Sequence, residues 1–255
     1  MRAVIVGYGS MGKEIERALL ERNHTIAARV DPSPENGDAH ELDESLLRSA
    51  EVAIEFGASG GVLENARRYA GAGIAAVVGT TGWEESRDAV RKTIEQSEIA
   101  YLWGANFSIG AHLFFDLVEQ AARLIDSLPQ YDIMMLEAHH NRKKDSPSGT
   151  ALTAAARILA AGTRKRRIVD TKLDRRIEPD ELHIASLRGG SHPGLHSVIV
   201  DSPADTIEIT HTARNRSGFA VGAVLAAEWL VARKKRGFLQ VEDFIQELLK
   251  EKKTK

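Results

Sequence analysis

The sequence predicts an α/β protein in which an open parallel sheet comes first and an α+β region follows. Short apolar runs alternate with amphipathic helical patterns up to about residue 106, which is typical of a parallel sheet with helical crossovers. A glycine-rich turn separates the first apolar run from the first helical pattern. After residue 106 the alternation ends, and a long helix precedes strands in which apolar and polar residues alternate. These three observations indicate two domains.

The first domain should contain buried strands, because parallel strands covered by helices on both faces consist of continuous apolar runs. Such runs occupy residues 3–6, 25–30, 52–56, 75–78 and 100–103. Amphipathic helices are predicted after Gly12 and over residues 61–72 and 84–97. The polar segment 33–42 is predicted to be a loop.

The second domain is predicted to contain an antiparallel or mixed sheet with helices on one face. A helix over residues 109–127 precedes a strand over 132–138, a helix from 148 to about 161, and strands over 183–188, 196–201 and 206–213. The last two strands flank a Ser-Pro-Ala-Asp turn and should form a hairpin. Two final helices, over 219–231 and 241–249, are expected to return to the first domain. The predicted domains are therefore residues 1–106 with 216–255, and residues 107–215.

Composition excludes several classes of function. A net charge of −2 with 27% charged residues argues against a general nucleic-acid or membrane-surface role. The basic clusters 164–167 and 233–236 are interpreted as solvated surface charge, with nucleic-acid binding as the alternative. The chain has no cysteine, which rules out disulfides, thiol nucleophiles and thiolate metal sites. Neither a signal peptide nor an apolar run of about 18 residues is apparent, so a cytoplasmic location is expected.

The glycine-rich turn has the pattern of a dinucleotide-binding site. It reads Gly7-Tyr8-Gly9-Ser10-Met11-Gly12 and lies between a predicted strand and a predicted helix. The first glycine permits the tight turn, the second lets a pyrophosphate approach the backbone, and the third allows close helix–strand packing. Asp31 follows Gly12 by 19 positions, at the end of the second strand, where it can accept from a ribose hydroxyl. The sequence therefore predicts a Rossmann-type domain; the alternative is a merely structural glycine turn.

Two more loops are expected to contact the same cofactor. They follow successive strands and therefore should lie at the carboxyl edge of one sheet, where such ligands bind. Without that context each would be interpreted as a structural turn. The loops are Gly79-Thr80-Thr81-Gly82 and Gly104-Ala105-Asn106-Phe107.

A histidine- and lysine-rich segment carries the candidate chemistry. His139 and His140 precede Lys143 by a few positions, and imidazole is the usual proton carrier near neutral pH. Ser148 could cap a helix and leave the N–H groups of Gly149 and Thr150 available to an anion. Paired histidines at a strand end are also commonly structural. A zinc site is the third possibility, but the spacing offers no third nearby ligand, so no metal is predicted.

This segment resembles the signature of the dihydrodipicolinate reductase family, and blocks from Gly7 to about Leu230 agree in order and spacing. The matching blocks are Glu137-Ala138-His139-His140, Lys143, Asp145-x-Pro147-Ser148-Gly149-Thr150-Ala151, Gly79-Thr80-Thr81-Gly82, Asn106-Phe107-Ser108-x-Gly110, Ser186-x-Arg188-Gly189-Gly190, Gly194-x-His196, Ile209-Thr210-His211-x-Ala213 and Phe219-Ala220-x-Gly222-Ala223. The chain departs from the pattern in a first glycine loop that is one residue shorter than in some members.

The resemblance implies NAD(P)H-dependent reduction of 4-hydroxy-tetrahydrodipicolinate, in lysine biosynthesis through diaminopimelate. It implies His139 as catalytic acid/base, Lys143 as proton donor, and His140, Gly149 and Thr150 as contacts of a substrate carboxylate. It also implies a homotetramer built through the sheets of the second domain. The implied cofactor contacts are residues 7–12, Asp31, Gly79, Thr80, Thr81, Gly104, Ala105, Asn106, Phe107, Arg216 and Phe219.

The sequence also bears on the choice between NADH and NADPH and on two alternative functions. Asp31 is followed by Pro32 and not by a basic residue, so a dedicated contact to the 2′-phosphate of NADPH is missing there. Arg29 should point to the same side of the strand and could partly compensate. NADH is therefore expected to serve at least as well as NADPH. The rivals are another Rossmann-fold dehydrogenase, such as an aspartate or homoserine dehydrogenase, and a non-catalytic nucleotide-sensing regulator; the regulator would require a DNA-binding module, which is not apparent.

Overall fold

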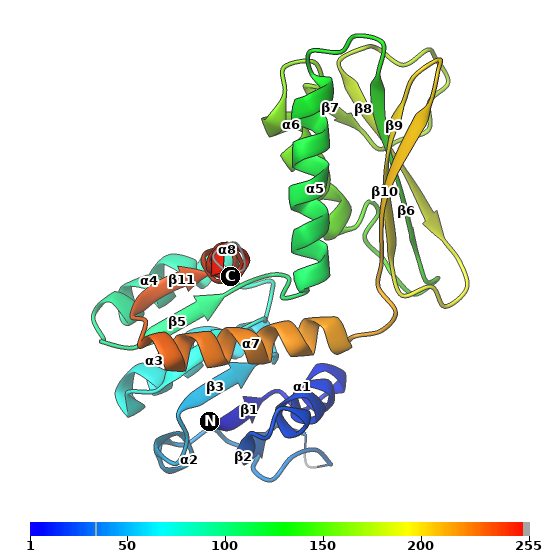
Figure 1. Ribbon diagram of the computed structural model, residues 1–255. Helices are drawn as coiled ribbons and strands as arrows, with labels where there is room; N and C mark the ends of the chain where they lie inside the picture. The colour runs from blue at the N-terminus through cyan, green and yellow to red at the C-terminus, as the bar shows by residue number, and fades with distance from the viewer. Residues whose placement is uncertain (34, 252–255) are drawn as a thin grey trace. The chain divides into compact units, whose positions relative to one another are not determined.

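The computed structural model describes residues 1–33 and 35–251. They form two compact units. One consists of Met1–Ile109 and the C-terminal segment from Arg216, and the other is Gly110–Asn215 (Figure 1). No helix among the described residues is long and apolar enough to cross a membrane.

The first unit is built on a six-stranded sheet in which all neighbouring strands pair in parallel. The strand order is β11-β5-β4-β3-β1-β2. The strands are β1 (Arg2–Val6), β2 (Thr25–Val30), β3 (Val52–Glu55), β4 (Ala75–Val78), β5 (Ala100–Trp103) and β11 (Gly237–Gln240). This order and the parallel pairing confirm the predicted Rossmann-like sheet.

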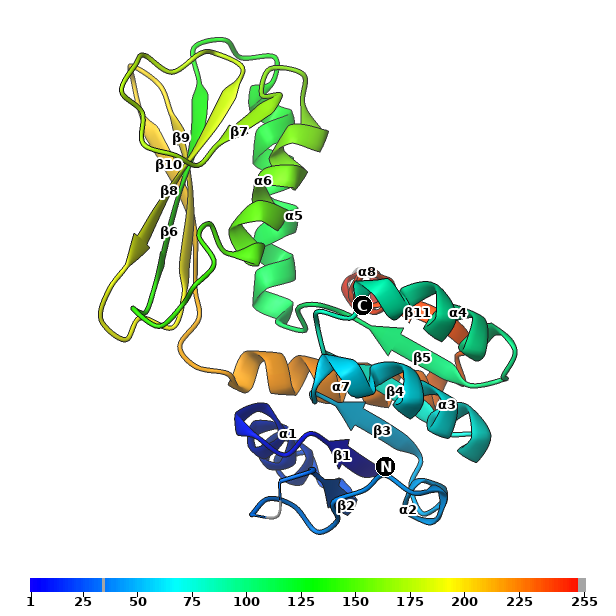
Figure 2. The same cartoon turned by 180° about the vertical axis from the view of Figure 1, so that it is seen from behind.

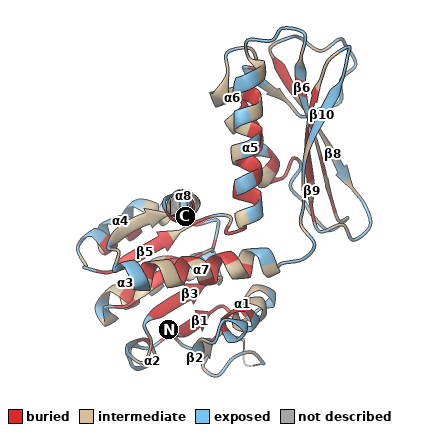
Figure 3. Cartoon of the chain, viewed as in Figure 1, coloured by how far each residue is buried: buried red, intermediate tan, exposed pale blue. Residues whose placement is uncertain are grey.

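Helices cover both faces of this sheet, as Figure 2 shows from behind. Alternate residues of β1 point to opposite faces: Ala3 and Ile5 join one apolar core, and Val4 and Val6 join the other. The first core includes helices α1 (Ser10–Glu21), α7 (Ser217–Arg233) and α8 (Val241–Glu251); the second includes α2 (Glu44–Arg48), α3 (Val62–Ala72) and α4 (Arg87–Glu95). Short 3₁₀ turns, η1 (Ser59–Gly61) and η2 (Glu84–Ser86), precede α3 and α4. The inner strands are therefore buried along most of their length (Figure 3).

The second unit has a five-stranded sheet in the order β10-β9-β6-β8-β7. Its strands are β6 (Asp132–His139), β7 (Arg167–Val169), β8 (Glu181–Arg188), β9 (Leu195–Asp201) and β10 (Thr206–Thr212). Helices α5 (Ile109–Ile125) and α6 (Gly149–Ala161) share an apolar core with one face, which receives Ile133 and Met135 from β6. The opposite face carries Met134, which is 36% exposed.

The second sheet is mixed, which is one of the two arrangements expected from the sequence: β6 and β7 both run parallel to β8, while β9 pairs antiparallel with β6 and β10. Other parts of the architecture differ from the sequence-based expectation. The basic cluster 164–167 was interpreted as solvated surface charge, but Lys165 is 7% exposed and pairs with Asp132, and Arg167 begins β7. Neither β7, β11 nor α2 was expected. The two strands are three and four residues long. They are too short to show a pattern in the sequence, because pairing of their backbones with a neighbouring strand is what defines them.

Candidate active site

Packing constrains the first and third glycines of the glycine turn in the first unit. Gly7 has a φ of +87°, and a Cβ added there would lie 2.4 Å from the carbonyl oxygen of Phe56. A Cβ added to Gly12 would lie 2.3 Å from the carbonyl oxygen of Gly7. Nothing lies within 4 Å of a Cβ added to Gly9. Two glycines are thus required by packing, and the middle one borders open space at the start of α1, where a phosphate can approach.

Asp31 lies beside this turn at the end of β2. Its Oδ2 accepts from the backbone N–H of Tyr8 at 2.7 Å, and its Oδ1 accepts from the N–H of Ser33 at 3.0 Å. The Gly7 N–H donates to the Val30 carbonyl at 2.8 Å. These bonds fix a carboxylate next to the glycine turn, and each oxygen keeps a lone pair for a ribose hydroxyl.

The two other predicted cofactor loops have packing roles of their own. The Thr80 hydroxyl accepts from the Gly57 N–H at 3.0 Å, so it connects two neighbouring loops. A Cβ on Gly79 would lie 2.1 Å from the Phe56 ring, and one on Gly104 would lie 2.5 Å from Val241. Packing alone therefore explains both glycines, and their contact with a cofactor stays a prediction.

The remaining predicted cofactor residues belong to the same unit but differ in exposure. Phe107 is 1% exposed, so its side chain is part of the core. The Asn106 side chain accepts from the Ser108 N–H at 2.8 Å. Arg216 directly precedes α7, and its carbonyl accepts from the N–H of half-buried Phe219 at 3.1 Å. Ser10, Thr81, Ala105 and Arg216 are exposed, and Met11 is half-buried.

In the second unit, His139 is held by a buried carboxylate. Glu137 lies two residues before it on β6, is fully buried, and accepts through Oε2 from the His139 Nδ1. Arg188, at the end of β8, donates from Nη2 to Glu137 Oε1 at 2.7 Å. The same Nη2 donates to the Asp145 carbonyl at 2.6 Å and ties the histidine- and lysine-rich loop to the sheet. His139 is therefore fixed in orientation, with Nδ1 carrying its proton.

Electrostatics keep the carboxylate charged and the imidazole neutral. Burial alone raises the pKa of Glu137, but hydrogen bonds from Arg188 and His139 outweigh it and hold that pKa below its usual range. Burial lowers the pKa of His139; Glu137 opposes the shift, and the positive charges of Lys143 and Arg188 add to it. The Nε2 of His139 faces Gly194, where an added Cβ would lie 3.0 Å away. At neutral pH this nitrogen is a proton acceptor.

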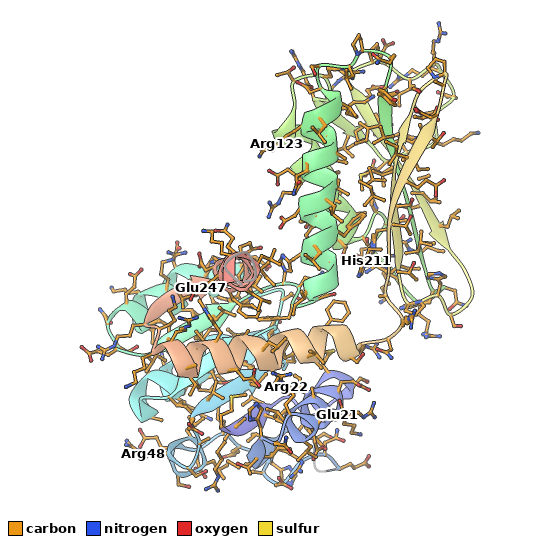
Figure 4. All side chains as sticks on the ribbon, in the orientation of Figure 1. Glu21, Arg22, Arg48, Arg123, His211 and Glu247 are labelled. Atoms are coloured by element: carbon orange, nitrogen blue, oxygen red, sulfur yellow. The ribbon has the colours of Figure 1, made fainter. Side chains whose placement is uncertain are left out.

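A second histidine lies beside His139. His196, on β9, is 4% exposed, and its ring centroid is 5.0 Å from that of His139. Burial, with the charge of His139 adding to it, lowers the pKa of His196 to about 4. His211, labelled in Figure 4, comes from β10, and its ring lies 6.3 Å from that of His196. Sequence spacing could not reveal this neighbour, because the pairing of Glu137 with His196 across β6 and β9 brings it here.

The start of α6 offers an anion-binding terminus. The Ser148 hydroxyl accepts from the Ala151 N–H at 3.2 Å, which confirms the expected cap, and lies 3.0 Å from the His196 Nε2. Asp145 forms an ion pair with Lys143 at 2.9 Å. Lys143 is the main cause of a lowered pKa at Asp145, and the Gly149 N–H contributes. A carboxylate of the chain itself thus pairs with the predicted proton donor, Lys143, close to the start of α6.

Three of these residues could in principle ligate a metal ion. One potential ligand atom from each of Glu137, His139 and His196 lies within 4.8 Å of the others. The third ligand that sequence spacing did not offer therefore exists, on a different strand. Both oxygens of Glu137 are already bonded, one to Arg188 and one to His139. These bonds explain the position of these side chains without requiring a metal ion: Glu137 orients His139.

Comparison with known proteins identifies the family. Residues 1–107 match a family model described as dihydrodipicolinate reductase, N-terminus, and residues 110–245 match its C-terminus. A 4-hydroxy-tetrahydrodipicolinate reductase of Christiangramia forsetii is 36% identical over 250 residues, covering 98% of this chain and all of the relative. One of Archaeoglobus fulgidus is 32% identical, covering 96% of this chain and all of the relative.

A solved structure shares the fold. Dipicolinate-bound dihydrodipicolinate reductase from Paenisporosarcina sp. TG-14 superposes with a TM-score of 0.75 at 22% identity, covering 94% of this chain and 97% of the other. The expected α/β fold and the resemblance seen in the sequence are both confirmed. The chain belongs to the dihydrodipicolinate reductase family.

Proposed function

We propose that the protein reduces 4-hydroxy-tetrahydrodipicolinate to tetrahydrodipicolinate with a reduced nicotinamide dinucleotide, in lysine biosynthesis through diaminopimelate in the cytoplasm. Family membership and the names of relatives that match along nearly the whole chain support this activity. The observation that carries most weight is the oriented His139 close in sequence to Lys143 and to the capped start of α6. The other Rossmann-fold dehydrogenases considered would not require this combination.

The substrate is a cyclic dicarboxylate, and we assign one carboxylate to the start of α6. Gly149 and Thr150 supply N–H groups at the positive end of the helix, and His140 and Lys143 supply side-chain donors. The environment of Asp145 supports the assignment, because its carboxylate already pairs with Lys143, and the Gly149 N–H helps to lower the pKa of that carboxylate. Asp145 is an exposed residue that can move aside when the substrate binds.

Replacing the 4-hydroxyl by hydrogen requires a hydride at C4 and a proton for the departing hydroxide. The bound dinucleotide supplies the hydride. Lys143 donates the single proton with which the hydroxide leaves as water. The neutral His139 relays its replacement from solvent to Lys143 through Nε2, because its Nδ1 is bonded to Glu137. Approach of the dianionic substrate raises the pKa of both groups, which favours their charged forms when the substrate is present.

We assign the dinucleotide to the glycine turn and Asp31. The open space at Gly9 and the two bonds that fix the Asp31 carboxylate support this assignment. We propose that NADH serves at least as well as NADPH, because the carboxylate repels a 2′-phosphate and Pro32 supplies no cation.

We also propose a homotetramer assembled through the sheet of the second unit. The sheet face that α5 and α6 leave open carries apolar side chains, among them Met134 at 36% and Leu187 at 57% exposure. An open apolar face of a sheet is a common interaction surface. Sedimentation or light scattering measures the assembly state directly, and a monomer at micromolar concentration contradicts the proposal.

The decisive experiment follows oxidation of NADH at 340 nm after freshly generated 4-hydroxy-tetrahydrodipicolinate is added to the purified chain. Formation of tetrahydrodipicolinate in step with NADH loss supports the function. Oxidation of NADH with aspartate- or homoserine-pathway substrates, and none with this one, contradicts it.

A further inference from the structure

A network of ion pairs surrounds Arg29, two residues before Asp31 on β2. The Arg29 Nε donates to Glu16 Oε1 at 2.9 Å, and its Nη2 bonds to the same oxygen. Its Nη1 donates to Asp38 Oδ2 at 2.9 Å. All three guanidinium nitrogens therefore bond to carboxylates, one from α1 and one from the loop after β2.

The network lies beside the carboxylate that we assign to the ribose. Tyr8 connects the two: its backbone N–H donates to Asp31, while the Arg29 guanidinium lies 5.8 Å from the centre of its ring. The Tyr8 hydroxyl also bonds to Glu16. Arg29 therefore pairs with two carboxylates, and Tyr8 connects this network to a third, that of Asp31. The two ion pairs raise the pKa of Arg29 above its usual value.

Dinucleotide sites distinguish the two cofactors at this position. An acidic residue binds the 2′-hydroxyl of NADH, and a nearby arginine accommodates the 2′-phosphate of NADPH. Arg29 has the chemistry of such an arginine, but Glu16 and Asp38 already occupy its donors.

We propose that Glu16 and Asp38 are specificity-determining residues, because they neutralise Arg29 and so make this corner select a ribose 2′-hydroxyl over a 2′-phosphate. The inference rests on the proposed cofactor site. It adds that Asp31 does not act alone, and that Arg29 becomes a ligand for the 2′-phosphate once its partners are removed. The alternative is that the ion pairs only fasten the loop after β2 to α1, in which case they alter stability and leave selectivity unchanged.

Binding of two fragments to the full chain tests the proposal without turnover. Calorimetry gives the Kd of adenosine 2′,5′-bisphosphate, which carries the extra phosphate, and of 5′-AMP, which lacks it. The ratio of the two values is compared for the wild-type chain and for Glu16→Gln combined with Asp38→Asn. In the double variant we expect the affinity for the bisphosphate to rise about tenfold relative to the affinity for 5′-AMP, equivalent to about 1.4 kcal/mol.

Two further variants separate selectivity from structure. Adding Arg29→Leu to the double variant should abolish the gain, because the released cation is then absent. Glu14→Gln is the matched control, since Glu14 is on the same helix and pairs with the exposed Arg17; its ratio should equal that of the wild type.

The inference is overturned if the double variant keeps a ratio within about threefold of the wild type, or if the gain persists without Arg29. Failure of the ratio to move, with NADH and 5′-AMP still bound, leaves the proposed function intact. If the wild-type chain binds neither fragment nor NADH, the proposed cofactor site and this inference both fail.

Discussion

Glu137 and His139 lie on the same face of β6, two residues apart, and the buried carboxylate of the first bonds to the Nδ1 of the second. Strand geometry makes this pair possible, because alternate side chains point to the same side. Arg188 neutralises the other carboxylate oxygen, so a charged glutamate remains stable without solvent. The result is an imidazole whose orientation and tautomer are both fixed.

The bond between these two residues predicts that Glu137 acts as a positioning residue. Glu137→Gln should lower kcat about tenfold, a part of the roughly 10²–10⁴-fold that an acid/base group contributes. Because Glu137 opposes the fall in the pKa of His139, its loss should move the pH at which His139 titrates to a lower value. The positive charges that remain near His139, those of Lys143 and Arg188, both favour the neutral ring. The pH dependence of kcat, measured from pH 5 to 9, reports this shift.

Glu119→Gln is a suitable control, because Glu119 also pairs with arginine in the second unit but lies on α5. A purely structural role for Glu137 would lower stability and leave the pH profile unmoved. Arg188→Lys should preserve part of the activity lost in Arg188→Ala, since an ammonium can still neutralise the carboxylate.

His139 and Lys143 are predicted to carry the proton chemistry, and His140 to bind. His139→Ala and Lys143→Ala should each lower kcat by about 10²-fold or more. His140→Ala should chiefly raise KM. Steady-state kinetics at saturating NADH separate the two effects. A folded His139 or Lys143 variant with near-normal kcat contradicts its assignment.

The anion site proposed at the start of α6 predicts inhibition by planar dicarboxylates. Pyridine-2,6-dicarboxylate should compete with the substrate for Gly149 and Thr150. Thr150→Val should weaken it by about 1–3 kcal/mol, the scale for leaving a polar partner unsatisfied. Thr163→Val is the control, because its hydroxyl bonds to Asp126 beyond the C-terminal end of α6. Equal inhibition constants for the Thr150 variant and the control would rule out the contact.

Local features of the fold and the site could be predicted from the sequence, whereas contacts set by strand pairing could not. The glycine turn was predictable because steric overlap permits only glycine at Gly7 and Gly12. Glu137 is predictable as the partner of His139 from the two-residue period of a strand, because both side chains must lie on the same face. His196 and Arg188 could not be predicted as neighbours of His139, because the register of β6 with β9 and β8 brings them to the site. The same limit applies to β7 and β11, which depend on pairing with distant segments.

The last prediction concerns Glu55, a buried carboxyl in the first unit. Burial raises its pKa to about 7, against the opposing hydrogen bonds from Asn65 and Tyr69. Between the unfolded value of 4.5 and this folded value, the native chain binds more protons than the unfolded chain. The free energy of unfolding therefore falls as pH rises through this window, by about 3 kcal/mol from this residue.

Because other groups titrate over the same range, the contribution of Glu55 is best measured as a difference from Glu55→Gln, which keeps the shape of the side chain without its charge. Urea unfolding from pH 4.5 to 8 should show the wild type losing stability relative to the variant as pH rises. Glu51→Gln, at an exposed site beside the same strand, should track the wild type throughout. Parallel curves for wild type and Glu55→Gln would mean that the native carboxyl titrates as it does in the unfolded chain, and that Asn65 and Tyr69 bind it as a stable carboxylate.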